Sequence, residues 1–153
     1  MAVGFSAVDD DLYRELILEH FRHPRHQGEV EDADHVVDGN NPLCGDEVRL
    51  SWKAADGRLE PIGFVGKGCS ISLASASMLC DAVSGANVEA ARETARRFRA
   101  MLLEGGPVDS LGDLEALRGV ASYPARIKCA VLPWNALLQG LDEGAITGDE
   151  AGS

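Results

Sequence analysis

The period of the hydrophobic pattern changes at Cys69, and this change constrains the fold more than any other feature of the sequence. Before this cysteine, Val48, Leu50 and Trp52 alternate with polar residues, which is typical of a half-buried β-strand. Beyond it, apolar residues recur at helical spacing until Gly85 stops the pattern. These residues are Ile71, Ala74, Met78, Ala82 and Val83. The sequence therefore predicts that a sheet ends and a helix starts at one cysteine.

The rest of the chain shows the same two kinds of pattern. Short β-branched or alternating segments at residues 35–38, 47–53 and 62–64 predict three antiparallel strands. Helical spacing predicts five helices, which run from Ser6 to Pro24, from Cys69 to Gly85, from Asn87 to Gly105, around residues 114–117 and from about Ile127. Pro133 is expected in the first turns of the last helix, where its missing amide hydrogen matters little. We therefore expect an α+β fold, with a small three-stranded antiparallel sheet packed by about five helices.

Length and charge bound the domain organisation and the class of partner. A chain of 153 residues can bury a core without disulfides or a structural metal. We expect one domain over residues 1–153, with a core at about residues 10–142 and an acidic, Gly-rich tail at 143–153. The 14 basic and 25 acidic residues give a formal net charge of -11, which disfavours a nucleic-acid partner. Because no leader or uninterrupted apolar span is evident, we expect a cytoplasmic protein without a membrane partner.

Three cysteines and one aspartate are candidate metal ligands. Four cysteines in a chain without a secretory signal favour metal or redox chemistry over a disulfide framework. Cys44 and Asp46 share a turn between predicted strands, and Cys129 lies near the start of the last helix. At Cys69, a predicted helix start, unpaired N–H groups and the helix dipole favour the thiolate. Cys80 lies on an apolar helix face, and we interpret it as a buried structural thiol outside the site.

The charges around these ligands are mutually consistent. Three thiolates and one carboxylate around a divalent cation carry a formal charge of -2, and Arg126 and Lys128 flank the last cysteine. Three sulfurs and an oxygen suit zinc, or a cluster held at a fourth position by a weak oxygen ligand. The spacing contains no CxxC pair and does not show that the four residues meet. The residues alone therefore leave both the metal and the grouping open.

Four segments resemble signature regions of a known family. The strings NPLCGDEV, GKGCSISLASASML and ARIKCAVLPW are similar, in this order, to the three signature segments of the IscU/SufU family of iron–sulfur cluster assembly proteins. The segment EHFRHPRHQG resembles the N-terminal region of the same family. The resemblance covers about residues 10–142. It implies an α+β fold in which the three motif cysteines converge at one end of the molecule.

In two features this sequence resembles the SufU branch of the family more than the IscU scaffolds. Scaffold proteins typically carry a histidine directly before the third cysteine, where this chain has Lys128. The stretch from Gly85 to Ser122 leaves room for an insertion that SufU-like proteins carry. The resemblance thus implies a single SufU-like domain that acts as a zinc-dependent sulfurtransferase. The implied zinc ligands are Cys44, Asp46, Cys69 and Cys129.

The resemblance also implies a role for each ligand. A residue of a SufS-like cysteine desulfurase replaces Cys44 on zinc, and the freed Cys44 thiolate accepts persulfide sulfur. Cys69, Cys129 and Asp46 hold the metal during this step. We expect Arg126 to orient Asp46 or the incoming persulfide through its planar fork of donors. A SufBCD-type assembly scaffold is the implied downstream partner.

Two other functions would use the same residues. A scaffold would assemble a transient [2Fe–2S] cluster on them, and a structural zinc module would bind a partner without chemistry. An aspartate ligand is unusual in structural zinc sites, which favour cysteine and histidine in short paired spacing. The sequence alone leaves the scaffold as the first alternative.

Three histidines, His20, His23 and His26, share a spacing that also occurs in metal sites. Pro24 interrupts the predicted helix between them, so they do not share one helical face. Imidazoles near a helix C-terminus also suit the helix dipole. We therefore interpret these histidines as residues of a helix end and not as ligands.

Overall fold

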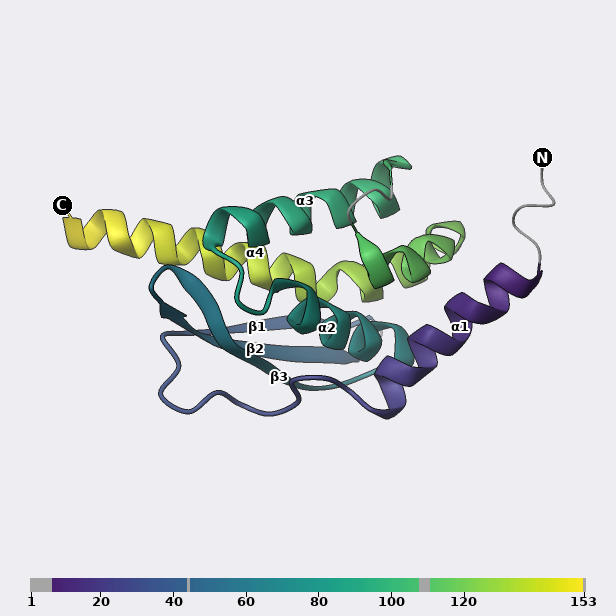
Figure 1. The fold of residues 1–153 in the computed structure, drawn as a ribbon, viewed down its shortest axis with the longest axis horizontal. Coiled ribbons are helices and arrows are strands. Elements are labelled where there is room, and N and C mark those ends of the chain that lie inside the picture. The colour runs from purple at the N-terminus through teal and green to yellow at the C-terminus, as the bar shows by residue number, and fades with distance from the viewer. Residues whose placement is uncertain (1–6, 44, 108–110, 153) are drawn as a thin grey trace.

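The computed structural model describes residues 7–43, 45–107 and 111–152, which form an α+β architecture (Figure 1). Within these residues the elements follow in the order α1 (Ala7–Arg22), β1 (His35–Asn41), β2 (Asp46–Ala55), β3 (Arg58–Lys67), α2 (Ser70–Val83), α3 (Val88–Glu104), the 3-10 helix η2 (Gly112–Ser122) and α4 (Pro124–Gly152). This order confirms the predicted fold class, and η2 is longer than the helix predicted around residues 114–117. None of the described helices is long and apolar enough to cross a membrane.

The sheet is an antiparallel meander with strand order β1-β2-β3. Trp52 of β2 pairs with His35 of β1 and with Ile62 of β3. Val48, Leu50 and Trp52 are all buried, as their alternation predicted. Figure 1 shows α4 along one face of the sheet and α3 on the side of α4 that faces away from the sheet. The core therefore lies between the buried face of the sheet and the helices.

Capping residues define the starts of α2 and α3. Cys69 is the N-cap of α2, and its sulfur accepts a hydrogen bond from the backbone N–H of Ser72 at 3.5 Å. Asn87 caps α3 by accepting from the N–H of Ala90 at 2.7 Å. A capping side chain provides a partner for one of the N–H groups that a helix start leaves unpaired. Both predicted helix starts are confirmed.

The last helix begins earlier than predicted. α4 starts at Pro124 and not near Ile127, because the first helical position needs no amide hydrogen and suits the fixed φ of proline. Pro133 consequently lies inside the helix, and the prediction that it falls in the first turns is wrong. Without an amide hydrogen, Pro133 cannot donate to the carbonyl of Cys129, four residues earlier.

A buried serine of α2 connects to α4 beside this proline. The Ser75 hydroxyl donates to the carbonyl of Ala130 at 2.6 Å, and the indole N–H of Trp134 donates to Ser75 Oγ at 3.0 Å. All three residues are buried. The bonds join the two helices where α4 lacks one of its own hydrogen bonds, so α2 helps to set the path of α4.

Small residues let α4 approach the sheet closely. A Cβ atom at Gly39 of β1 would lie 3.3 Å from side-chain atoms of both Ala136 and Leu132 on α4. A Cβ atom at Gly140, one turn after Ala136, would overlap the side chains of Val37 and Trp52. The contact between α4 and the sheet therefore depends on the absence of a side chain at these glycines.

We predict that Gly140→Ala destabilises the protein by about 1–3 kcal/mol, because the new methyl group forces Val37 and Trp52 from their packed positions. Thermal or denaturant unfolding monitored by circular dichroism measures the effect. Gly119→Ala is the matched control, since a Cβ atom at Gly119 meets nothing within 4 Å. Equal stability of the two variants would contradict this account of the packing.

Candidate metal centre

Asp46, Cys69 and Cys129 meet at one end of the sheet, although they come from three different elements. Asp46 is the first residue of β2, Cys69 precedes α2 and Cys129 lies in α4. One ligand atom from each residue lies within 4.8 Å of the others. Asp46 and Cys129 are fully buried, and Cys69 is partly exposed. The structure thus brings together three of the four residues that the sequence marks as ligands.

Asp46 is bound directly to the helix start. Its Oδ1 accepts the backbone N–H of Cys69 at 2.9 Å, and its Oδ2 lies 3.9 Å from Cys69 Sγ. Gly68 makes this approach feasible: its φ is +150°, and a Cβ atom there would overlap the Asp46 carboxylate. The carboxylate therefore uses one oxygen for the backbone and presents the other to the sulfur.

The sulfur of Cys69 is held from the helix side. Ser72 provides a backbone N–H at 3.5 Å, and its hydroxyl lies 3.8 Å from the same sulfur. The Ser72 hydroxyl also donates to the Cys69 carbonyl at 3.1 Å. One backbone N–H donor and the N-terminal, positive end of the α2 dipole therefore lie at this sulfur.

Cys129 supplies a buried sulfur from α4, and Arg126 lies beside it. The Cys129 sulfur is 3.7 Å from the carbonyl of Ala125, in the preceding turn of the helix. The charge of Cys69, together with a hydrogen bond to Cys129, raises the pKa of the exposed Arg126 guanidinium. Arg126 therefore faces the two sulfurs, and its role in orienting Asp46 or the incoming persulfide stays a prediction.

Cys44, the fourth predicted ligand, lies outside the described residues. The residues around it form a tight connection, in which Asn41 of β1 pairs with Asp46 of β2 and accepts the N–H of Gly45 at 2.9 Å. Gly45 has a φ of +73°, a conformation that favours glycine. Leu43 is 83% exposed. The connection that carries Cys44 thus opens toward solvent at the described residues on either side of it.

The donor set fits a thiophilic divalent metal. Two thiols and a carboxylate are ligand types that zinc accepts, whereas magnesium and calcium prefer oxygen ligands alone. The buried Asp46 carboxylate is costly to keep in the interior unless its charge is paired. A bound cation would supply that pairing.

Comparison with known proteins assigns the chain to a family. Residues 12–130 match the family described as NifU-like N terminal domain, which is most of the chain. The chain belongs to the NifU-like N-terminal domain family. This family match and the solved relatives below confirm the fold that the signature segments predicted.

Relatives within the NifU-like family carry two kinds of name. The zinc-dependent sulfurtransferase SufU of Bacillus subtilis is 46% identical over 142 residues, which covers 91% of this chain and 95% of the relative. An iron–sulfur cluster assembly scaffold protein IscU of Streptococcus pyogenes is 40% identical, with coverage of 88% and 85%. A crystal structure of a putative scaffold protein for the SUF system from Fervidobacterium islandicum has a TM-score of 0.79 and 32% identity, and covers 83% of this chain and 94% of that chain.

The sequence did not point to Gly68 or Ser72 as residues of the site. Gly68 matters because its backbone lies against the Asp46 carboxylate, and Ser72 matters because its N–H donates to the sulfur of the N-cap Cys69. A glycine directly before a cysteine at a strand-to-helix junction is a local signal for Gly68. Cys80, in contrast, is buried and burial raises its pKa, which agrees with a structural thiol.

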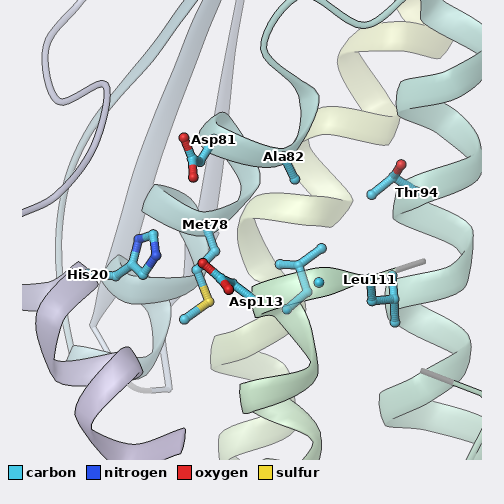
Figure 2. Close-up of a pocket in the computed structure, with 9 residues that line it drawn as sticks. His20, Met78, Asp81, Ala82, Thr94, Leu111 and Asp113 are labelled. Atoms are coloured by element: carbon cyan, nitrogen blue, oxygen red, sulfur yellow. The ribbon is translucent and has the colours of Figure 1, made fainter. Parts of the chain in front are cut away.

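A separate cavity of about 260 Å³ lies among α1, α2, α3 and η2 (Figure 2). His20 is fully buried beside it, and Asp81 and Asp113 line the same cavity. His20 Nδ1 lies 2.8 Å from Ser77 Oγ, which also accepts the N–H of Arg25 at 2.8 Å. The contact between His20 and Ser77 joins α1 to α2, which agrees with the interpretation of His20 as a residue of the helix end.

We predict that Gly68→Ala lowers the metal affinity by at least about tenfold while the fold is kept, because the methyl group displaces the Asp46 carboxylate. Competition with a chromogenic chelator measures the affinity. Gly57→Ala is the control, since Gly57 also has a positive φ, +76°, but a Cβ atom there meets nothing within 4 Å. A metal affinity of Gly68→Ala similar to that of Gly57→Ala would contradict the role of the contact between residue 68 and Asp46.

We predict that His20 makes the fold less stable in acid. Burial, followed by the charge of Arg25, lowers the pKa of folded His20 below its ordinary 6.5, against the opposing effect of Asp113 and Asp81. The unfolded chain therefore binds the proton first, and stability falls as the pH drops below about 6.5.

This contribution has a slope of up to about 1.4 kcal/mol per pH unit. Urea unfolding between pH 7.5 and 5.5 measures it, and His20→Gln removes it. His23→Gln, at an exposed histidine, serves as control and retains the slope of the unmodified protein. An unchanged slope in His20→Gln would contradict the assignment.

Proposed function

We propose that this chain is a zinc-dependent sulfur acceptor, which takes persulfide sulfur from a cysteine desulfurase for iron–sulfur cluster assembly. The convergence of Asp46, Cys69 and Cys129 within 4.8 Å carries the proposal. The 46% identity to a protein named zinc-dependent sulfurtransferase supports it. The chain acts in this proposal as a sulfurtransferase and as the protein co-substrate of the desulfurase.

Cys44 is the proposed fourth ligand. It lies two residues before Asp46, in the short connection between β1 and β2, so the covalent chain keeps it within about 8 Å of that aspartate. Bound zinc would keep its sulfur ligands deprotonated at neutral pH. The carboxylate of Asp46 is a harder and weaker partner for zinc than a thiolate, which leaves the ligand set exchangeable.

Cys44 is also the proposed acceptor. Cys129 is fully buried, and Cys69 is held by hydrogen bonds with the backbone N–H of Ser72 and with Asp46, so both are suited to remain as anchors. For a cysteine flanked by the exposed Leu43 and by Gly45, we expect a lower free-energy cost of changing position than for Cys69 or Cys129. Cys44 is therefore the ligand that would leave a bound zinc ion, while Asp46, Cys69 and Cys129 would keep holding it.

The transfer step is a thiol–persulfide exchange. The Cys44 thiolate attacks the outer sulfur of the persulfide, and a new sulfur–sulfur bond forms on Cys44. The bond between that sulfur and the donor cysteine breaks, and the donor cysteine leaves as a thiolate. The exchange needs no added oxidant or reductant, because one sulfur–sulfur bond replaces another.

Arg126 is the proposed positioning residue for this exchange. Its guanidinium faces the sulfurs of Cys69 and Cys129, and it is exposed to solvent. A planar cation at this place stabilises the negative charge of the thiolates and of an incoming persulfide. Lys128, also exposed, adds a second positive charge near Cys129.

A scaffold for a [2Fe–2S] cluster is the second candidate, since a 40% identical relative is named an assembly scaffold. The two functions use the same residues and differ in the species they bind.

A SufS-like desulfurase and a SufBCD-type scaffold are the proposed partners of the sulfur acceptor. Purified acceptor is colourless with about one zinc per chain, whereas a brown protein whose visible absorption tracks activity would favour the cluster scaffold.

We predict that sulfur from a cysteine desulfurase appears on Cys44. The protein is incubated with desulfurase and cysteine, and the persulfide is located by mass spectrometry. Cys44→Ser reduces desulfurase turnover by at least about tenfold, because the attacking thiolate is lost. Asp46→Ala impairs sulfur acceptance with the fold kept.

Cys80→Ser is the matched control and retains activity, because Cys80 is buried away from the centre. A persulfide on Cys69 or Cys129 with Cys44 unmodified would overturn the assignment of the acceptor. Desulfurase activation that survives Cys44→Ser would instead favour a structural zinc module.

A further inference from the structure

A groove of about 670 Å³ runs along the surface beside the metal centre. Residues of α1, of η2, and of the starts of α2 and α4 line it. Its walls include Tyr13, Ile17, Ile71, Val120, Tyr123 and Arg126. Figure 1 shows α1 and η2 approaching each other at the end of the molecule where α2 and α4 begin.

The groove is continuous with the proposed site. Ser70, which lines it, is covalently next to the ligand Cys69. Arg126, which also lines it, faces the sulfurs of Cys69 and Cys129. A chain segment in the groove would therefore pass directly beside the metal ligands.

The charge of the groove is opposite to that of the protein. The described lining residues include two arginines, Arg14 and Arg126, and no aspartate or glutamate. The whole chain, in contrast, has a formal net charge of -11. A positive groove on an acidic protein attracts a carboxylate and disfavours a second copy of the same acidic chain.

The side chains of the groove are those of a protein interface. Tyrosine and arginine are enriched at the centres of interfaces, where charged carboxylates and lysine are depleted. Tyr123 is 64% exposed although it is large and largely apolar, and it lies at the junction between η2 and α4. Tyr123 therefore adds an exposed aromatic side chain to the groove, of the kind that interface centres favour.

The shape of the groove is set by a contact between its two walls. The Tyr13 hydroxyl of α1 donates a hydrogen bond to the Glu115 carboxylate of η2. This bond joins α1 to η2 at a residue that lines the groove. Both walls are therefore in place before a partner arrives, which lowers the cost of ordering on binding.

We propose that this groove seats an extended, carboxylate-bearing segment of the protein that donates the sulfur. The proposal rests on the proposed function, because transfer between two protein sulfurs requires the donor to cover the surface beside the metal centre. Arg14 and Arg126 pair with the acidic side chain, and Tyr123 packs against the backbone and apolar side chains of the segment. The groove thus fixes the register in which the persulfide approaches.

The test compares variants in the desulfurase reaction, with a SufS-like desulfurase, cysteine and the zinc-loaded chain. Tyr123→Ala is expected to raise the chain concentration for half-maximal alanine production by about tenfold, with the maximal rate within about twofold. Arg14→Glu is expected to raise this half-maximal concentration further and to remove most of the dependence of that concentration on salt. Leu103→Ala is the control, because Leu103 is a 48% exposed apolar residue of α3 outside the groove. This variant is expected to leave the half-maximal concentration unchanged.

Binding measured by calorimetry separates this inference from the proposed function. If the unmodified chain binds the desulfurase but accepts no sulfur, the proposed function fails, and weaker binding of Tyr123→Ala still supports the groove. If sulfur transfer proceeds and both groove variants behave as Leu103→Ala, the groove proposal is overturned. It is also overturned if Tyr123→Ala dissociates a dimer of this chain, or if the variants lose zinc.

Discussion

The hydrogen bond between the Cys69 amide and the Asp46 carboxylate is the interaction on which the site depends. It ties the first residue of β2 to the N-cap of α2, two positions that are 23 residues apart in the sequence. The same carboxylate is buried, and its second oxygen faces the Cys69 sulfur. Gly68 is needed because any side chain there would occupy the place of the carboxylate. One local geometry therefore fixes a ligand oxygen, a ligand sulfur and the direction of a helix dipole.

The third ligand depends on packing far from the site. Cys129 is carried by α4, whose position on the sheet is set by the close approach at Gly140 and by the hydrogen bond from Ser75 to Ala130. Pro133 removes a helical hydrogen bond next to that connection. A shift of α4 along the sheet would move the Cys129 sulfur relative to Asp46 and Cys69. The core thus determines whether three separate elements form one coordination group.

Local charge, and not net charge, determines what can approach the centre. The protein carries 25 acidic against 14 basic residues, yet Arg126 faces the two described sulfurs and lines the adjoining groove. Beside this cation, a cluster of two sulfurs and a carboxylate is more favourable for an approaching anion than the acidic surface is.

The sequence by itself determined the elements and the donor types. Alternation in β2 and the caps at Cys69 and Asn87 were predicted correctly, because strand period and helix capping are set by neighbouring residues. The tertiary structure decided which donors meet, because the spacings of 23 residues from Asp46 to Cys69 and of 60 residues from Cys69 to Cys129 do not define a distance in space. The tertiary structure also decided where α4 starts. It placed Arg126 beside the two sulfurs and Gly68 against Asp46. These depend on packing between elements, which no local pattern encodes.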